Sequence, residues 1–172
     1  MITKIDFSIL DFIQNNMKGG IMDFIMKFIT HLGDAGAIWI VIALALLCFK
    51  KTRKAGMYLS VSLLLTALIG NVILKNIFAR TRPFIAANHP IIINPPSGFS
   101  FPSGHTSSSF AAATTIGLSY KKYTPYAFIL AFLIGFSRLY LYVHYPSDVL
   151  VGAILGIGIA VICKKLVYNK IS

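Results

Sequence analysis

Apolar runs without any charged residue constrain this chain most, because each run needs an apolar environment along its whole length. The clearest run, Ala55 to Leu74, has twenty residues and no charge. As a helix it is long enough to cross a hydrocarbon core of roughly 30 Å. Charged residues make up only 12% of the 172 residues, whereas soluble domains carry roughly 25%. The sequence therefore predicts an integral membrane protein made of α-helices.

Other runs of the same kind occupy most of the chain. Four of them contain no charged residue: Ala35–Phe49, Thr106–Tyr120, Tyr123–Ser137 and Val149–Cys163. A fifth, residues 21–32, is apolar on a single helical face. At about fifteen residues, several are shorter than the roughly twenty that a span requires, so they extend further or end below the membrane surface. We predict an all-α bundle of about six transmembrane helices over residues 20–165, within a single domain covering residues 1–172.

An amphipathic pattern precedes these runs. In residues 1–18, Ile5, Ile9 and Phe12 recur at helical spacing with Asp6 and Asp11 between them. This pattern is typical of a helix that lies at a membrane interface, and equally of a helix that packs as a cap on the bundle. Glycines at positions 19 and 20 then end the helix.

Basic clusters indicate how the bundle is oriented. Lys50–Lys54, Lys121–Lys122 and Lys164–Lys170 occupy alternate connections, and the positive-inside rule assigns all three to the cytoplasm. Residues 75–105 and 138–148 then lie together on the extracytoplasmic face of a multi-pass plasma-membrane protein. The formal net charge of +11 does not indicate nucleic-acid binding, because the cations lie between apolar runs rather than along one face.

The two outer segments carry side chains suited to binding a phosphate. Arg82 and Arg138 can each donate two hydrogen bonds to its oxygens, and Lys75 adds a point charge. Ser103 is placed to cap a helix that begins near Gly104, so free backbone N–H groups there can bind an anion. We expect a phosphate-binding site at the outer ends of the helices.

Two histidines allow the nucleophile and the acid to be different residues. Pro146 fits the first turn of a helix, which places His144 just before that helix and Asp148 within reach of its ring. Asp148 can then accept a hydrogen bond from one ring nitrogen and leave the other free to attack phosphorus. His105, from another segment, can protonate the leaving oxygen and later activate water.

No metal or other cofactor is expected. Asp148 is the only acidic residue after residue 34, whereas magnesium and two-metal sites use several carboxylates. A zinc site made of His105, His144 and Asp148 is compatible with the count of ligands, but the surrounding cations oppose it.

These residues form a pattern that resembles the three-part signature of the type 2 phosphatidic acid phosphatase superfamily. The three parts are Lys75-x6-Arg82-Pro83, Pro102-Ser103-Gly104-His105 and Ser137-Arg138-x5-His144-x3-Asp148. The resemblance extends over about residues 20–165 and implies a metal-independent phosphomonoester or diphosphate hydrolase. It further implies a phosphohistidine on His144 and an acid at His105. The residues that it implies hold the phosphate are Lys75, Arg82, Ser103, Gly104 and Arg138.

The sequence does not distinguish between several lipid substrates. Undecaprenyl diphosphate, phosphatidylglycerol phosphate, phosphatidate and a lipid A phosphate all fit a lipid phosphatase surrounded by membrane lipids. Two other functions use the same anion pocket: a non-enzymatic anion binder or transporter, and a vanadate-dependent haloperoxidase. The sequence leaves the oligomeric state undetermined.

Several residues outside the signature receive simpler interpretations. We expect His31 to cap a helix, Arg80 to contact the rim of the site and His89 to lie in a loop. Tyr140, Tyr142 and Tyr145 suggest an interfacial aromatic belt. The connection 84–101 is long enough to form a wall of the substrate entrance, and the spacing of Gly152 and Gly156 suggests close helix packing.

Overall fold

The computed structural model describes residues 2–166; Lys170, the last cation of the third basic cluster, lies outside them. These residues contain helices and no strand, which confirms the prediction of an all-α fold. The α-helices are α1 (Ile2–Met17), α2 (Gly20–Leu32), α3 (Ala37–Cys48), α4 (Arg53–Thr66), α5 (Lys75–Phe78), α6 (Pro83–Ala86), α7 (Gly104–Ser119), α8 (Thr124–Tyr140) and α9 (Pro146–Leu166). The short helices η1 (Asp34–Gly36) and η3 (Lys121–Tyr123) and the π-helix η2 (Ala67–Leu74) join them.

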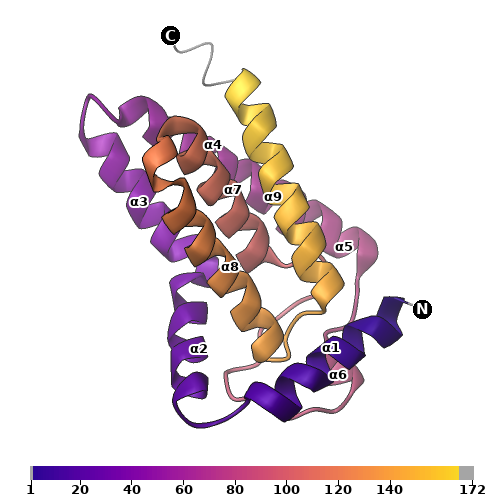
Figure 1. The fold of residues 1–172 in the computed structure, drawn as a ribbon. Coiled ribbons are helices and arrows are strands. Elements are labelled where there is room, and N and C mark those ends of the chain that lie inside the picture. Colours follow the sequence, from indigo (N-terminus) through magenta and orange to yellow (C-terminus); the bar gives the residue numbers. More distant parts are fainter. Residues whose placement is uncertain (1, 167–172) are drawn as a thin grey trace.

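Helix α7 lies at the centre of the bundle and packs against α9, α8 and α4 (Figure 1). Its contact with α9 is close because two glycines face it. A Cβ on Gly152 would lie 2.9 Å from the carbonyl oxygen of Ser103, and one on Gly156 only 2.2 Å from that of Ser107. The close helix packing expected from these two glycines is therefore confirmed, and it joins α9 to α7 of the same chain.

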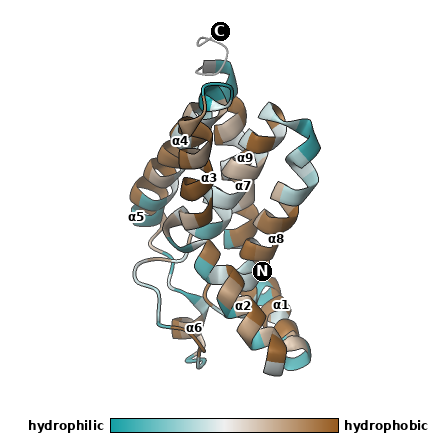
Figure 2. Ribbon diagram, turned by 90° about the vertical axis from the view of Figure 1, so that its left-hand side faces the viewer, coloured by the Kyte–Doolittle hydropathy of each residue, from teal (hydrophilic) through white to brown (hydrophobic). Residues whose placement is uncertain are grey.

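The interior and the exterior of the bundle have an unusual distribution of polarity. Helix α7 buries small and hydroxylated side chains such as Ser109 and Thr115. The Ser109 hydroxyl accepts from Trp39 Nε1 at 2.9 Å, and the Thr115 hydroxyl donates to Ser62 Oγ at 3.2 Å. Large apolar side chains face outward, among them Leu64 at 69% exposure, and Figure 2 shows hydrophobic residues along the outside of α3 and α4. Small polar interiors and apolar exteriors are typical of helices packed in lipid.

Two helical segments of residues 2–166 are long and apolar enough to cross a membrane: Arg53–Ala86 and Pro146–Lys165. A third results if α2 and the segment Asp34–Cys48, bent by 45° at their junction, act as one span. The remaining helices are shorter: α7 has 16 residues and α8 has 17, below the roughly twenty that a full crossing requires. The helices are thus those of a membrane protein, but their lengths do not confirm the predicted six complete spans.

The N-terminal helix α1 lies across the end of the bundle where α9 begins (Figure 1). Its side chain Leu10 is fully buried against Tyr142 and Tyr145. In contrast, Ile5, which the amphipathic pattern placed on the apolar face, is 54% exposed. Helix α1 therefore packs on the bundle and at the same time presents apolar side chains outward.

Candidate active site

The three predicted segments meet at one end of a cavity of about 760 Å³. Six of the eight predicted site residues line it: Lys75, Arg82, Gly104, His105, Arg138 and His144. The other two, Ser103 and Asp148, are fully buried behind them. The rest of the cavity is largely apolar and runs between α3 and α4, where Ile40, Leu44, Leu63 and Leu64 line it. A charged end and an apolar extension therefore belong to one cavity.

His144 lies in the short connection between α8 and α9 and is 2% exposed. Its Nε2 is 3.2 Å from Arg82 Nη1, and its Nδ1 is 3.5 Å from Asp148 Oδ2. No hydrogen bond forms at the second distance, so the expected hydrogen bond from the His144 ring to Asp148 is absent in this structure. Burial, followed by the charges of Arg138 and other nearby cations, lowers the pKa of the imidazole well below its ordinary value, so the ring is neutral at neutral pH.

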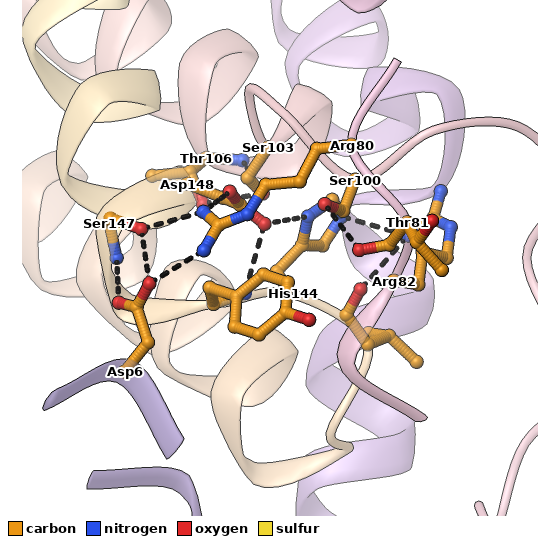
Figure 3. Close-up of polar contacts among 12 residues, drawn as sticks. Asp6, Arg80, Thr81, Arg82, Ser100, Ser103, Thr106, His144, Ser147 and Asp148 are labelled. Atoms are coloured by element: carbon orange, nitrogen blue, oxygen red, sulfur yellow. Dashed lines mark hydrogen bonds and ion pairs between the residues drawn. The ribbon is translucent and has the colours of Figure 1, made fainter. Parts of the chain in front are cut away.

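Asp148 occupies the first turn of α9, which begins at Pro146 as predicted. Its Oδ2 accepts the backbone N–H of Tyr145 at 2.9 Å, and its Oδ1 accepts Arg80 Nη1 at 2.6 Å (Figure 3). Arg80, expected from the sequence as a contact at the rim of the site, is partly exposed and directs its guanidinium onto Asp148. An isolated buried carboxylate is unfavourable, and Arg80 supplies the compensating charge.

Arg82 directly precedes α6 and Arg138 lies in the last turn of α8, and both are 3% exposed. Arg82 donates to the backbone carbonyl oxygens of Gly98 at 2.9 Å, Ser97 at 3.0 Å and Val143 at 3.0 Å. It thereby fixes the long connection 84–101 beside the site. Arg138 donates through Nη1 to the hydroxyl of Thr30, while its Nε has no hydrogen-bond partner among the described residues.

Ser103 is the N-cap of α7, as predicted from the sequence. Its Oγ accepts from the backbone nitrogen of Thr106 at 3.5 Å and from the Thr106 hydroxyl at 2.9 Å. At Gly104, an added Cβ would lie 2.5 Å from Asn71 Oδ1, so any other residue there requires the Asn71 side chain to move. Asn71 belongs to the π-helix η2 and also lines the cavity. π-Helical turns are frequent at functional sites, but no pattern in the sequence indicated this uncharged side chain.

His105 has an acidic partner that sequence reasoning missed. Its Nε2 is 2.9 Å from Asp34 Oδ1, and Asp34 Oδ2 is 2.8 Å from Nδ1 of His31. Asp34 reaches the site because the chain bends between α2 and α3, where Ala35 adopts a φ of 50°. Gly33 allows His105 to approach, since a Cβ there would lie 2.8 Å from the imidazole. His31 is thus part of a hydrogen-bond network with Asp34 and His105 rather than only a helix cap.

The prediction of an interfacial tyrosine belt was wrong. Tyr140, Tyr142 and Tyr145 are 1–3% exposed, because α1 and α2 cover them. The Tyr142 hydroxyl donates to Asp11 Oδ1 at 2.8 Å and the Tyr140 hydroxyl donates to Asp23. These tyrosines anchor the first two helices to the loop that carries His144.

Two loop features complete the surroundings of the cavity. Pro96 and Ser97 line it, so part of the connection 84–101 is a wall of the cavity. His89 lies in this connection, outside the cavity lining, and stacks on Tyr142 with ring centroids 4.1 Å apart. Among residues 2–166, no three His, Cys, Asp or Glu side chains are grouped as metal ligands.

This chain is similar to known proteins both in sequence and in fold. A sequence profile described as PAP2 superfamily matches residues 55–172. An undecaprenyl-diphosphatase of Sulfolobus acidocaldarius is 33% identical over 162 residues, covering 93% of this chain and 76% of the relative. Among solved structures, LpxE of Aquifex aeolicus superposes with a TM-score of 0.82 at 30% identity, covering 94% of this chain and 95% of LpxE.

A second solved structure is a transmembrane PAP2-type phosphatidylglycerolphosphate phosphatase from Bacillus subtilis. It superposes with a TM-score of 0.80 at 25% identity, and the match covers 99% of this chain and 88% of that protein.

Proposed function

Since this chain belongs to the PAP2 superfamily, we propose that it is a membrane-embedded lipid phosphatase that acts at the cavity described above. Several of its relatives are named phosphatases, so the chain is an enzyme of that class, and we propose this function in preference to an anion transporter or a haloperoxidase. One observation carries the proposal: a single cavity joins a cluster of cations and histidines to an apolar channel.

The chemistry follows from the positions of the two histidines. The neutral His144 attacks phosphorus through Nε2, an N–P bond forms, and the bond from phosphorus to the leaving oxygen breaks. His105 gives its proton to that oxygen. In the second half, His105 takes a proton from water, the water oxygen attacks phosphorus, and the N–P bond breaks to release phosphate.

The phosphate is held by charge and by backbone dipoles in this proposal. Lys75, Arg82 and Arg138 surround it, and the N-terminus of α7 after Ser103 adds the N–H group of Gly104. These groups stabilise the charge that develops on the phosphoryl oxygens, so we propose that the reaction needs no metal ion. Asp148 orients His144 through the Nδ1 side of the ring.

The apolar part of the cavity indicates the substrate class. A lipid whose phosphate lies beside His144 extends its chain between Ile40 and Leu44 of α3 and Leu63 and Leu64 of α4. Undecaprenyl diphosphate, phosphatidylglycerol phosphate and phosphatidate share this form, and two of these lipids appear in the names of relatives. We propose that the substrate is one of these lipid phosphates or diphosphates.

We further propose that the cavity opens on the extracytoplasmic face and that the chain crosses the membrane about six times. Helix α1 would lie at the outer interface as the amphipathic helix predicted from the sequence. The exposure of Phe12 (63%) beside the burial of Asp6 (2%) supports this location, because apolar side chains directed away from the protein suit contact with lipid.

Replacing the nucleophile tests the proposed function. His144→Ala should abolish phosphate release from undecaprenyl diphosphate, phosphatidylglycerol phosphate and phosphatidate alike, because His144 is the proposed nucleophile and His105 serves as the acid. Release is measured with purified protein in detergent, for each lipid separately, and the wild-type rates identify the preferred substrate. His89→Ala, a histidine outside the cavity lining, is the control and should retain activity. An active His144→Ala protein would refute the assignment.

A further inference from the structure

Asp6 of α1 is linked to the active site through Arg80. We infer that Asp6 is a positioning residue of the reaction, which sets the charge and the orientation of Asp148 by holding Arg80. The inference rests on the proposed roles of His144 and Asp148. Neither α1 nor Asp6 falls in the region matched by the superfamily profile, which begins at residue 55.

Asp6 is 2% exposed and bonds to the start of α9 (Figure 3). Its Oδ1 accepts the backbone N–H of Ser147 at 2.9 Å, and its Oδ2 accepts the Ser147 hydroxyl at 2.7 Å. The first N–H groups of a helix have no partner within the helix, so Asp6 caps α9 from a different helix. Helix α1 is therefore fixed to the turn that carries Asp148.

The same carboxylate holds Arg80. Arg80 donates from Nη2 to Asp6 Oδ2 at 2.7 Å and from Nη1 to Asp148 Oδ1 at 2.6 Å, with its guanidinium 3.7 Å above the centre of the Tyr145 ring. Because Arg80 occupies Oδ1 of Asp148, Oδ2 is the oxygen that remains beside His144. Asp6 thus helps decide which way the catalytic carboxylate faces.

Charge makes Asp6 more than a structural anchor. Arg80 and Asp148 alone would form a neutral pair and offer the imidazole little negative potential. With Asp6 the cluster has two carboxylates and one guanidinium, and therefore one net negative charge. This charge lies on the Nδ1 side of His144, where Asp148 Oδ2 is 3.5 Å from the ring, whereas Arg82 contacts the ring at Nε2. It stabilises the positive ring that forms when Nε2 bonds to phosphorus.

The variant Asp6→Asn removes the negative charge and the acceptor for Arg80, but the amide oxygen can still accept the backbone N–H of Ser147 and cap α9. We expect kcat to fall about tenfold, measured with a lipid phosphate that the wild-type protein hydrolyses. KM and the inhibition constant of inorganic phosphate should stay within twofold, since the cations that hold the phosphate are unchanged. If the proposed function is wrong, the wild-type protein itself will not hydrolyse lipid phosphates. If only the role of Asp6 is wrong, the wild-type protein and Asp6→Asn will hydrolyse them equally fast.

Asp11→Asn is the matched control. It removes the same charge from the same helix, but Asp11 bonds to Tyr142 rather than to Arg80, so kcat should change less than twofold. The melting temperature of each variant is measured in the same detergent. The inference is overturned if Asp6→Asn retains wild-type kcat, if Asp11→Asn loses as much, or if kcat falls only together with weaker phosphate inhibition and a lower melting temperature.

Discussion

Four carboxylates from the first 34 residues, Asp6, Asp11, Asp23 and Asp34, all bond to residues of the later segments that build the active site. Asp6 bonds Arg80, Asp11 and Asp23 bond tyrosine hydroxyls, and Asp34 bonds His105. Their spacing within the N-terminal sequence indicated only amphipathic helices. Their partners lie 71 to 131 residues away, and no local pattern predicts such contacts.

The contact between Asp34 and His105 leads to a prediction at this scale. Asp34→Asn should lower kcat about tenfold, because His105 loses the carboxylate that orients its ring and stabilises its protonated form, and acid–base catalysis contributes roughly 10²–10⁴-fold. Steady-state kinetics on a lipid phosphate provide the measurement. Asp23→Asn, which removes an equal charge near Tyr140, should stay within twofold of wild type. Equal rates for Asp34→Asn and wild type would contradict the role given to Asp34.

At the scale of elements, the packing of α7 on α9 aligns two halves of the site. Helix α7 carries Gly104 and His105 at its start, and α9 carries Asp148 in its first turn. The backbone N–H of Ser103 also donates to the carbonyl oxygen of Asp148 at 3.2 Å. The starts of the two helices are therefore held side by side, and the glycines of α9 set how closely the helices approach.

Gly156→Ala should destabilise the protein, because the new Cβ would meet two backbone atoms of α7: Ser107 O at 2.2 Å and Ala111 N at 2.7 Å. Overpacking of this kind costs about 1–3 kcal/mol, so the melting temperature in detergent should fall. Gly158→Ala is the matched control, since nothing lies within 4 Å of its Cβ, and alanine favours the helix by up to about 1 kcal/mol. Unchanged melting of Gly156→Ala would show that α9 can shift to accommodate the methyl group.

At the scale of the whole molecule, the cavity and the basic clusters lie at opposite ends of the bundle. The first cluster follows α3, the second joins α7 to α8, and the start of the third ends α9. The segments that carry Lys75, His105 and His144 occupy the other end. This arrangement supports an extracytoplasmic active site.

Labelling tests the orientation. A cysteine introduced by Ala87→Cys, in the outer connection, should react in intact cells with a maleimide that does not cross membranes. Cys48, which is exposed and precedes the first basic cluster, serves as the internal control and should react only after permeabilisation. The reverse order of reactivity, measured by mass shift on the purified protein, would place the active site in the cytoplasm.

The sequence by itself determined the membrane class, the helical fold and most of the polar residues that meet at the cavity, because charges are so rare in this chain that each cluster stands out. It also located the cap at Ser103 and the start of α9 at Pro146, which depend on local backbone chemistry. Only the tertiary structure decided the partners of these residues. Arg80 met Asp148, the tyrosines became buried, and Asp6 and Asp34 reached the site, because the packing of α1 and α2 is determined by contacts between distant segments.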